Sequence, residues 1–450
     1  MKKSFSFFVI VILAIVAGGY VYYSPLFEKT PPKVEVGDSG YWNLLDSIPL
    51  TISDDTGVKY YKITFNDGVK TTVLARKVLT IPQKEVTLKL NPPSLGMFFK
   101  AKTVKLTIEA VDSSKWNFFR GNKTLKTLNL KIDKRKPEVS IIRNTFAIRR
   151  GGSAVAIVKI TDANLKSAYV EFNNKIKFNF VPFYKKNYYI ALIAWPLKMK
   201  QFNRFNVVAT DKANNVTIRK IPVYIKNIAC KKGNLKISDD FIDNISTDII
   251  KQSNDVVPDN AVDIFKYEND VIRARNVATI KSISRRYMDR SEVDSFSLYP
   301  FSRLEGSTVE AGFCDDRHYI YHHKQIDEVS HMGLDMASVK HAPIIESNMG
   351  KVIFYNYLGI YGNAIIVDHG LGLQTLYAHT SSSTVRVGDN VRRGEVIART
   401  GSTGGVMGDH LHFGVLVQGI EVNPKEWMDK SWIKTRIIDV INSAKKAIDL

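Results

Sequence analysis

From about Lys33 to Ile225 the sequence consists of short runs in which apolar and polar residues alternate, separated by Asn, Asp and Gly. Alternation with a period of two is typical of a β-strand that has one buried face. The run from Tyr60 to Phe65 is one example, and Asn66-Asp67-Gly68 directly after it favours a tight hairpin. The 20 tyrosines and 23 phenylalanines also favour β-structure. We therefore expect antiparallel sheets over the first half of the chain.

This β-rich region repeats itself loosely. The segment from Ile52 to Asn66 returns as the segment from Ile160 to Asn173, and a period of about 100 residues suits two β-sandwich domains in tandem. The boundary between them is expected at Lys136-Pro137, where a charged run meets proline. Both repeats resemble bacterial immunoglobulin-like domains, which implies a spacer rather than a ligand-binding role.

The pattern becomes helical between about residues 237 and 295. Ser238-Asp239-Asp240 can cap a helix whose apolar residues recur at helical spacing, and Ala261 to Met288 predicts a second helix. A rigid connector is the simpler interpretation of this segment, and a cover for a catalytic groove is the alternative. Residues 431–450 predict an amphipathic closing helix with a structural role.

The N-terminus combines Lys2 and Lys3 with an uncharged, largely apolar run from Ser4 to Tyr23. Twenty helical residues span about 30 Å, the thickness of the hydrocarbon core of a membrane. Positive charge before such a run keeps that end in the cytoplasm, so the remaining chain is expected on the extracytoplasmic (periplasmic) side. We predict a single-pass signal anchor. A cleaved signal peptide and a buried core helix are the alternatives.

The formal net charge of +20 indicates an acidic partner or surface. The Lys and Arg residues are spread along the chain, without a basic helix or zinc-finger spacing, so we favour a cell-wall polymer or an anionic membrane over nucleic acid. Cys230 and Cys314, the two cysteines of the sequence, are too few for a disulfide framework. Whether they pair with each other is open at this stage.

Four of the nine histidines fall into three short motifs within one β-rich segment. The first motif runs from His331 to Asp335, the second ends at His379, and the third is His410-Leu411-His412. Residues i and i+2 of a strand face the same side, so His410 and His412 should project together. Zinc suits such a set, because it binds neutral imidazole and carboxylate and keeps one position open for water in catalytic sites. Bound zinc acidifies that water, and a nearby histidine can take its proton.

Together these motifs resemble the lysostaphin/LytM-type zinc metallopeptidases. The resemblance runs from about Val309 to Trp427 and includes Gly312 to Arg317, which is similar to the family's Gly-Phe-Gly-x-Arg opening. It also includes Gly362 to Gly370, Gly401 to Gly404 and Val422 to Pro424. The resemblance implies a compact all-β peptidase domain with a groove.

The same resemblance implies that His331, Asp335 and His412 bind one Zn²⁺ per chain. His379 and His410 would orient water and stabilise the tetrahedral intermediate, with the choice of general base between them left open. Packing is at least as good an interpretation for two residues near the cleft and one at a turn: Asn363, Tyr377 and His369. Four histidines match no catalytic position and are expected in exposed loops: His318, His322, His323 and His341.

The implied activity is hydrolysis of peptide cross-links in peptidoglycan, with the cell wall, the cytoplasmic membrane and a protein regulator as candidate partners. A non-catalytic activator of other wall hydrolases is the main alternative, and a wall-binding protein with an incidental metal site is another. Residues 338–343 depart from the family's usual Pro-x-Gly-Thr-Pro, and Cys314 occupies a common glycine position. Neither departure removes a predicted metal ligand.

The predicted architecture is therefore mainly β. In chain order it comprises a transmembrane helix at residues 1–24, β-sandwich domains at 33–135 and 136–228, a helical connector at 237–295, an all-β peptidase domain at 300–430 and a C-terminal helix at 431–450.

Overall fold

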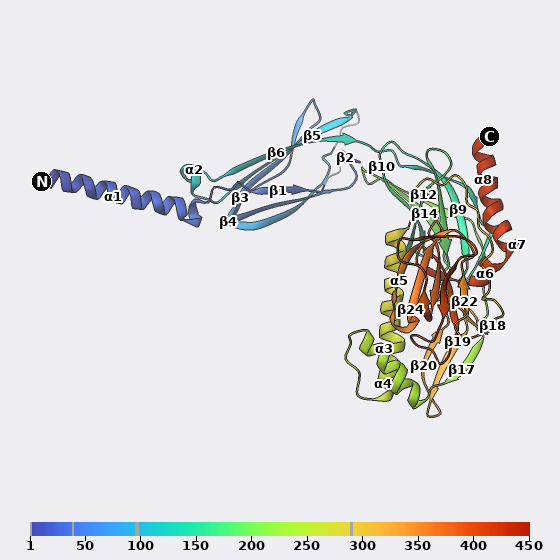
Figure 1. Cartoon of the computed structure of the whole chain (residues 1–450). Coiled ribbons are helices and arrows are strands. Elements are labelled where there is room, and N and C mark those ends of the chain that lie inside the picture. The colour runs from blue at the N-terminus through green and yellow to red at the C-terminus, as the bar shows by residue number, and fades with distance from the viewer. Residues whose placement is uncertain (1, 38–39, 95–98, 289–290) are drawn as a thin grey trace. The chain divides into compact units, whose positions relative to one another are not determined.

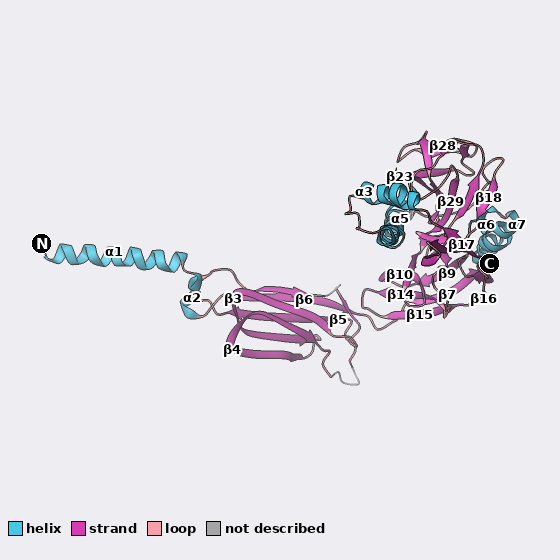
Figure 2. Cartoon of the chain, turned by 90° about the horizontal axis from the view of Figure 1, so that it is seen from below, coloured by secondary structure: helices cyan, strands magenta, loops and turns pink. Residues whose placement is uncertain are grey.

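The computed structural model describes residues 2–37, 40–94, 99–288 and 291–450, and strands make up most of its regular structure (Figure 1, Figure 2). The mainly β prediction is confirmed. The chain divides into two compact units. Unit 1 comprises Met1–Pro137, Asp162–Ser167 and Thr210–Val216, and unit 2 comprises Glu138–Thr161, Ala168–Ala209 and Thr217–Leu450.

The apolar N-terminal run forms one helix, α1 (Lys2–Tyr23), followed by the 3-10 turn η1 (Pro25–Phe27). The sequence predicts a membrane anchor at residues 1–24. Over the residues that the structure describes, however, no helix combines the length and the apolar character needed to cross a membrane. The predicted anchor therefore has no support in the structure.

The first β-module of unit 1 is a single six-stranded sheet in the order β1-β3-β5-β6-β2, with β4 paired to β3. Two separate sheets were predicted here. They merge because β3 continues through a register shift between Ser53 and Val58, so its first part pairs with β1 and its second part with β5. The predicted hairpin is present, since Asp67 Oδ1 accepts hydrogen bonds from the backbone N–H groups of Val69 and Lys70. The elements are β1 (Lys33–Val36), β2 (Tyr41–Trp42), β3 (Ile48–Asn66), β4 (Thr71–Leu90), β5 (Thr103–Asp112), α2 (Trp116–Phe119) and β6 (Lys123–Ile132).

The second β-module contains two four-stranded sheets. One sheet has the order β12-β13-β9-β7 and the other β11-β10-β14-β15. Most side chains of the central strands β9 and β13 are buried, as expected where two sheets face each other. The strands are β7 (Glu138–Asn144), β8 (Ala147–Arg149), β9 (Ser153–Thr161), β10 (Leu165–Phe172), β11 (Ile176–Asn179), β12 (Val181–Pro182), β13 (Tyr188–Ala194), β14 (Phe205–Asp211), β15 (Val216–Ile221) and β16 (Tyr224–Lys226).

Both helices expected in the connector are present, and each contains a π-helical turn. The first consists of η2 (Phe241–Ser246) and α3 (Thr247–Gln252). The second consists of α4 (Ala261–Lys266), η3 (Tyr267–Ile272) and α5 (Arg273–Tyr287). Residues 289 and 290 of the predicted connector lie outside the described residues.

This helical segment is more than a connector, because it shares one hydrophobic core with the peptidase region. Ile242, Phe265 and Ile280 pack in the same buried cluster as Ile366 and Leu376 from the peptidase sheet. The simpler interpretation, a rigid connector, stays a prediction, and the shared core adds a second role to the segment. The apolar face of the helices is needed to complete the core.

The peptidase region holds an eight-stranded sheet in the order β18-β21-β29-β25-β24-β23-β27, with β30 paired to β29. Two three-stranded sheets, β22-β28-β26 and β17-β19-β20, complete it. The strands are β17 (Lys232–Lys236), β18 (Thr308–Ala311), β19 (Asp316–Tyr321), β20 (Lys324–Ser330), β21 (Leu334–Ala337), β22 (Pro343–Ile345), β23 (Gly350–Tyr357), β24 (Asn363–Asp368), β25 (Leu373–Ala378), β26 (Thr380–Ser383), β27 (Asn390–Val391), β28 (Val396–Thr400), β29 (Leu411–Val417) and β30 (Ile420–Val422).

The strand β17 precedes the helices in sequence but belongs to the peptidase region in space. It pairs in parallel with β19, with Gly233 opposite Arg317 and Leu235 opposite Tyr319. Just before β17, Cys230 forms a disulfide with Cys314. The two cysteines, whose pairing the sequence leaves open, therefore pair with each other.

The predicted closing helix is present as α7 (Lys430–Ile433), η5 (Lys434–Ile438) and α8 (Asp439–Asp449), after the short α6 (Pro424–Met428). It packs against the second β-module, where Thr145 Oγ1 donates a 2.7 Å hydrogen bond to the carbonyl oxygen of Arg436. Within unit 2, the second β-module and the peptidase region are thus joined directly as well as through the chain.

Candidate functional site

Three predicted ligands come from two neighbouring strands and the turn before one of them. Asp335 lies in β21 and His412 in β29, and the antiparallel register places the two residues opposite each other. His331 stands four residues before Asp335, in the turn that leads into β21. The sheet therefore brings together residues that lie 77 positions apart in the sequence.

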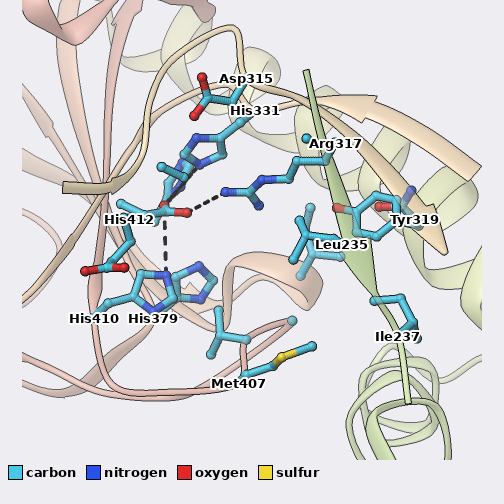
Figure 3. Close-up of a pocket in the computed structure, with 18 of the residues that line it drawn as sticks. Leu235, Ile237, Asp315, Arg317, Tyr319, His331, His379, Met407, His410 and His412 are labelled. Atoms are coloured by element: carbon cyan, nitrogen blue, oxygen red, sulfur yellow. Dashed lines mark hydrogen bonds and ion pairs between the residues drawn. The ribbon is translucent and has the colours of Figure 1, made fainter. Parts of the chain in front are cut away.

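Their ligand atoms converge on one point (Figure 3). Asp335 Oδ1 lies 3.0 Å from His331 Nε2 and 2.8 Å from His412 Nδ1, and the two imidazole nitrogens are 3.1 Å apart. All three side chains are buried. Gly333 makes this approach possible, because a Cβ atom there would lie only 2.4 Å from His412 Cε1.

Two further histidines stand beside this group. His379 follows β25 and His410 precedes β29; their ring centroids are 4.9 Å apart, and the ring of His379 is 5.9 Å from that of His412. His379 Nδ1 lies 2.8 Å from the carbonyl oxygen of Thr403, and His410 Nδ1 lies 2.9 Å from that of Gly408. A carbonyl oxygen can only accept, so each Nδ1 carries the proton and each Nε2 of the neutral ring is a free acceptor. Figure 3 shows all four histidines on the same side of the cleft.

The surroundings lower the pKa values of His379, His412 and Asp335, which favours neutral imidazole at the two histidines and an ionised carboxylate at Asp335. Burial lowers the pKa of His412 to about 4, and burial together with His410 and His412 holds the pKa of His379 well below its usual value. Burial alone would raise the pKa of Asp335, but the charges and hydrogen bonds of His331 and His412 outweigh it and hold that pKa well below its usual range. Neutral imidazole and ionised carboxylate are the forms that bind a metal.

These donors fit a zinc ion of the catalytic type. Two imidazole nitrogens and one carboxylate oxygen lie within 4.8 Å of one another, and three protein ligands leave a fourth position open. His331 Nδ1 makes a 2.9 Å hydrogen bond to the carbonyl oxygen of Gly312, an outer contact that orients a metal-binding ring. One other close group of carboxylates occurs among the described residues, Glu28, Asp54 and Asp112 in unit 1, and it contains no histidine.

Arg317 is a part of the site to which the sequence analysis gave no role. From β19, its Nη2 donates a 2.7 Å hydrogen bond to Asp335 Oδ2, so both oxygens of this carboxylate are engaged. Arg317 lies in the Gly312 to Arg317 motif, and this motif was the one sign in the sequence that Arg317 could belong to the site. Its function could not be read from the motif because it depends on the placement of β19 beside β21.

The remaining candidates have structural contacts. The Tyr377 hydroxyl donates to Glu346 Oε2 at 3.0 Å, and the Asn363 side-chain amide donates to the carbonyl oxygen of Thr380 at 3.3 Å. His369 Nδ1 lies 2.9 Å from the carbonyl oxygen of Met349. His322, His323 and His341 are exposed outside strands, as expected, whereas His318 is wrongly placed by the sequence analysis and lies in β19.

The histidines open onto a cleft of about 600 Å³. One wall is the peptidase region, including the loop from Gly405 to His410. The opposite wall comes from β17 and the helical segment, and Figure 3 shows Leu235 and Ile237 there, across from the histidines. The segment that precedes the peptidase domain in sequence therefore forms one wall of its cleft.

Residues 329–424 match the model of Peptidase family M23. Over 94 residues the chain is 44% identical to DD-carboxypeptidase/endopeptidase Mpg of Neisseria meningitidis, a match that covers 21% of this chain and 22% of that relative. It is 38% identical over 95 residues to peptidoglycan DD-endopeptidase ShyB of Vibrio cholerae, covering 21% and 22%. It is also 41% identical over 81 residues to murein hydrolase activator EnvC of Escherichia coli, covering 18% and 19%.

The chain thus matches about a fifth of the length of these relatives. The segment that matches the family model contains His331, Asp335, His379, His410 and His412. Residues 329–424 form a Peptidase family M23 domain of the LytM type.

Proposed function

We propose that this chain is a zinc-dependent endopeptidase that hydrolyses peptide cross-links in peptidoglycan. The observation that carries the proposal is the convergence of His331 Nε2, Asp335 Oδ1 and His412 Nδ1 in a cleft that also presents His379 and His410. The named activities of Mpg and ShyB, which share this domain, support the choice of peptidoglycan as substrate.

The chain's own residues have distinct roles in this proposal. Bound by His331, Asp335 and His412, zinc would polarise the scissile carbonyl and acidify a water molecule. His379 and His410 each present an unprotonated Nε2 that can accept the proton of the attacking water and return it to the leaving amine. Leu235 and Ile237 contribute apolar side chains to the facing wall, against which apolar parts of a substrate can pack.

A non-catalytic activator is the second candidate, because EnvC is named as one and matches the same domain. The retained ligand set favours the enzyme. An activator needs the surface of the domain but has no need of three metal ligands in contact or of two further histidines at the open side.

Substitution of the histidines in the full chain tests the proposal. We expect wild-type protein to hold about one zinc and to release monomers from defined muropeptide dimers, as followed by mass spectrometry. His331→Ala should lose both zinc and activity, whereas His379→Ala and His410→Ala should keep zinc and lose about 100-fold or more in kcat, the larger loss marking the base. His323→Ala, in an exposed turn, is the matched control and should change neither.

Two results would contradict the enzyme. Zinc-loaded wild-type protein that releases no fragments but stimulates a separate wall hydrolase would establish the activator instead. Equal activity of the His331→Ala variant and the wild type would remove the metal from the mechanism.

We further propose that the domain works outside the cytoplasm. The Cys230–Cys314 disulfide supports this, since such bonds persist in oxidising compartments. Attachment to the cytoplasmic membrane through residues 1–24 stays a prediction from the sequence. Membrane fractionation, combined with protease access to intact spheroplasts, tests both the compartment and the attachment.

A further inference from the structure

The wall of the cleft that faces the histidines contains two charged residues that the proposed mechanism does not use. Glu268 and Arg273 both line the cleft, together with Asn269 between them in sequence. They come from the π-helical turn η3 and the first residue of α5. A π-helical turn bonds residue i to residue i+5, so it brings positions 268 and 273 to the same side of the helix. Such turns are frequent at functional sites.

Glu268 is a buried carboxylate, with only 3% of its surface exposed. The Ser246 hydroxyl donates a 2.8 Å hydrogen bond to its Oε2. A Cβ atom on Gly405 would lie 2.9 Å from its Oε1, so this oxygen faces the loop that runs on to His410. Burial raises the pKa of Glu268, and the charge of Arg273 counteracts this, which places the two groups within electrostatic range.

Arg273 is held in place by a neutral partner. Its Nε donates to the backbone oxygen and to Oδ1 of Asn269, at 3.1 and 3.0 Å, and its Nη2 donates to the same Oδ1 at 2.5 Å. Asn269 is itself fixed, because its amide donates to Asp327 Oδ2 at 2.6 Å. A guanidinium has five N–H donors, and Nη1 takes no part in these bonds.

Neither charge is neutralised by a close partner. Among the residues that the structure describes, no ion pair within 4.0 Å joins Glu268 or Arg273 to any side chain. The charge of Arg273 acts on Glu268 and on the buried Glu421 without a direct ion pair. A buried carboxylate and an oriented guanidinium that are not paired directly are costly unless a ligand completes them. The same cleft is also lined by Leu235, Ile237 and Phe265, which suit an aliphatic chain.

We propose that Glu268 and Arg273 form a subsite for a substrate side chain that ends in a free amine and a free carboxylate, with Glu268 binding the ammonium and Arg273 the carboxylate. The proposal rests on the proposed function. Within peptidoglycan it selects stem peptides whose third residue is a diamino dicarboxylic acid, such as diaminopimelate, over those with lysine. An amidated diaminopimelate, which lacks the carboxylate, should bind poorly for the same reason.

Three cross-linked dimers test this subsite in the full zinc-loaded chain: one with free diaminopimelate, one with its amide and one with lysine. We expect the wild type to show at least a ten-fold higher kcat/KM for the free diaminopimelate dimer than for the other two. Glu268→Gln and Arg273→Gln should each raise KM for that dimer about ten-fold and leave kcat within about two-fold. Arg273→Gln should also erase the preference over the amide.

Arg275→Gln is the matched control, because Arg275 lies on the same helix but pairs with Asp255 outside the cleft. Melting temperatures and zinc content show whether each variant is folded and loaded. Equal kcat/KM for the three dimers, unchanged in both variants, would overturn the subsite and leave the proposed function standing.

Binding measurements separate the two proposals if no dimer is cleaved. Absence of cleavage by zinc-loaded protein contradicts the proposed function. Calorimetry with the same three dimers then reports on the subsite alone. A preference for free diaminopimelate that disappears in Glu268→Gln and Arg273→Gln supports the subsite, and equal affinity for all three dimers overturns it.

Discussion

Three of the four histidines of the candidate site are oriented by backbone carbonyls. His331, His379 and His410 all use Nδ1 for this contact and turn Nε2 toward the shared centre. A ring fixed in this way needs no reorientation when it binds a metal or accepts a proton. The loops that supply these carbonyls are therefore part of the site, although no side chain of theirs carries the chemistry.

Arg317 should support the metal through Asp335. Its hydrogen bond to Oδ2 leaves Oδ1 directed at the two imidazoles. We expect Arg317→Gln to weaken zinc binding about 10- to 100-fold, the usual effect of losing such an outer contact. Competition with a chromogenic chelator measures this affinity. Arg386→Gln, at an exposed position, is the control. Unchanged zinc affinity in Arg317→Gln would contradict this role.

Glu426 gives the stability of unit 2 a defined pH dependence. It lies in α6, accepts a 3.0 Å hydrogen bond from the backbone N–H of Ser153, and burial raises its pKa to about 7. Because the folded state holds this proton more tightly than the unfolded state, the free energy of unfolding should fall as pH rises from about 4.5 to 7. The loss is on the order of 3 kcal/mol.

Glu426→Gln should remove that loss. Thermal unfolding at pH 5 and pH 8 tests it, with the variant more stable than the wild type at pH 8 and the difference smaller at pH 5. Glu138→Gln, at an exposed site, should follow the wild type. Parallel pH profiles for Glu426→Gln and the wild type would disprove the effect.

The site histidines could be selected from sequence, whereas their supporting residues could not. A strand period of two places His410 and His412 on one side, and the family motifs select His331, Asp335 and His379. Gly333 depends on the register between β21 and β29, and Arg317 depends on its hydrogen bond from β19 to Asp335; no local pattern encodes either. The same holds for Glu268 and Arg273, which face the cleft only because the helix contains a π-helical turn.

Among the elements, β17 shows best how the site is assembled from distant segments. It is a short, largely polar strand, and its five residues would pass for a loop in the sequence. Pairing with β19 gives it its conformation, and the Cys230–Cys314 disulfide closes a loop of 84 residues beside it. The first β-module shows the opposite case, where local alternation correctly predicts strands but cannot predict that a bulged β3 merges two sheets into one.

Reduction of this disulfide should destabilise unit 2. Closing a loop of this length stabilises a fold by about 4.5 kcal/mol in the chain-entropy model. We therefore expect a reductant to lower the melting temperature of the wild type by several degrees. The double variant Cys230→Ser/Cys314→Ser should already melt at the lower temperature and show no further response, which is the control. An identical melting temperature of the wild type with and without reductant would show that the disulfide does not stabilise unit 2.

On the scale of the whole molecule, the net charge of +20 is a property that no single element provides. Such a charge attracts an acidic polymer over a distance of about 10 Å at 0.1 M salt, and added salt screens this attraction. The cell wall is an acidic polymer of this kind, so the charge agrees with the proposed substrate without selecting a particular bond in it.

Binding to isolated sacculi should accordingly weaken as salt rises. We expect the bound fraction of the inactive His331→Ala chain to fall strongly between about 0.05 and 0.5 M NaCl, measured by co-sedimentation. Cellulose, an uncharged polysaccharide, should retain little protein at either concentration. Retention on sacculi that does not change with salt would show that contacts other than charge dominate.

The pairing of β17 with β19 means that the boundary of the catalytic module does not coincide with the boundary of its family match. A shortened chain that starts near residue 300 would keep all five candidate histidine and aspartate positions yet lack the strand and helices that face them. Such a fragment would expose Ile366 and Leu376 to water where the helices now cover them. A chain cut at the edge of the family match would thus lose one wall of the cleft and be prone to aggregate. It would lose its selectivity for the peptide before it lost the metal.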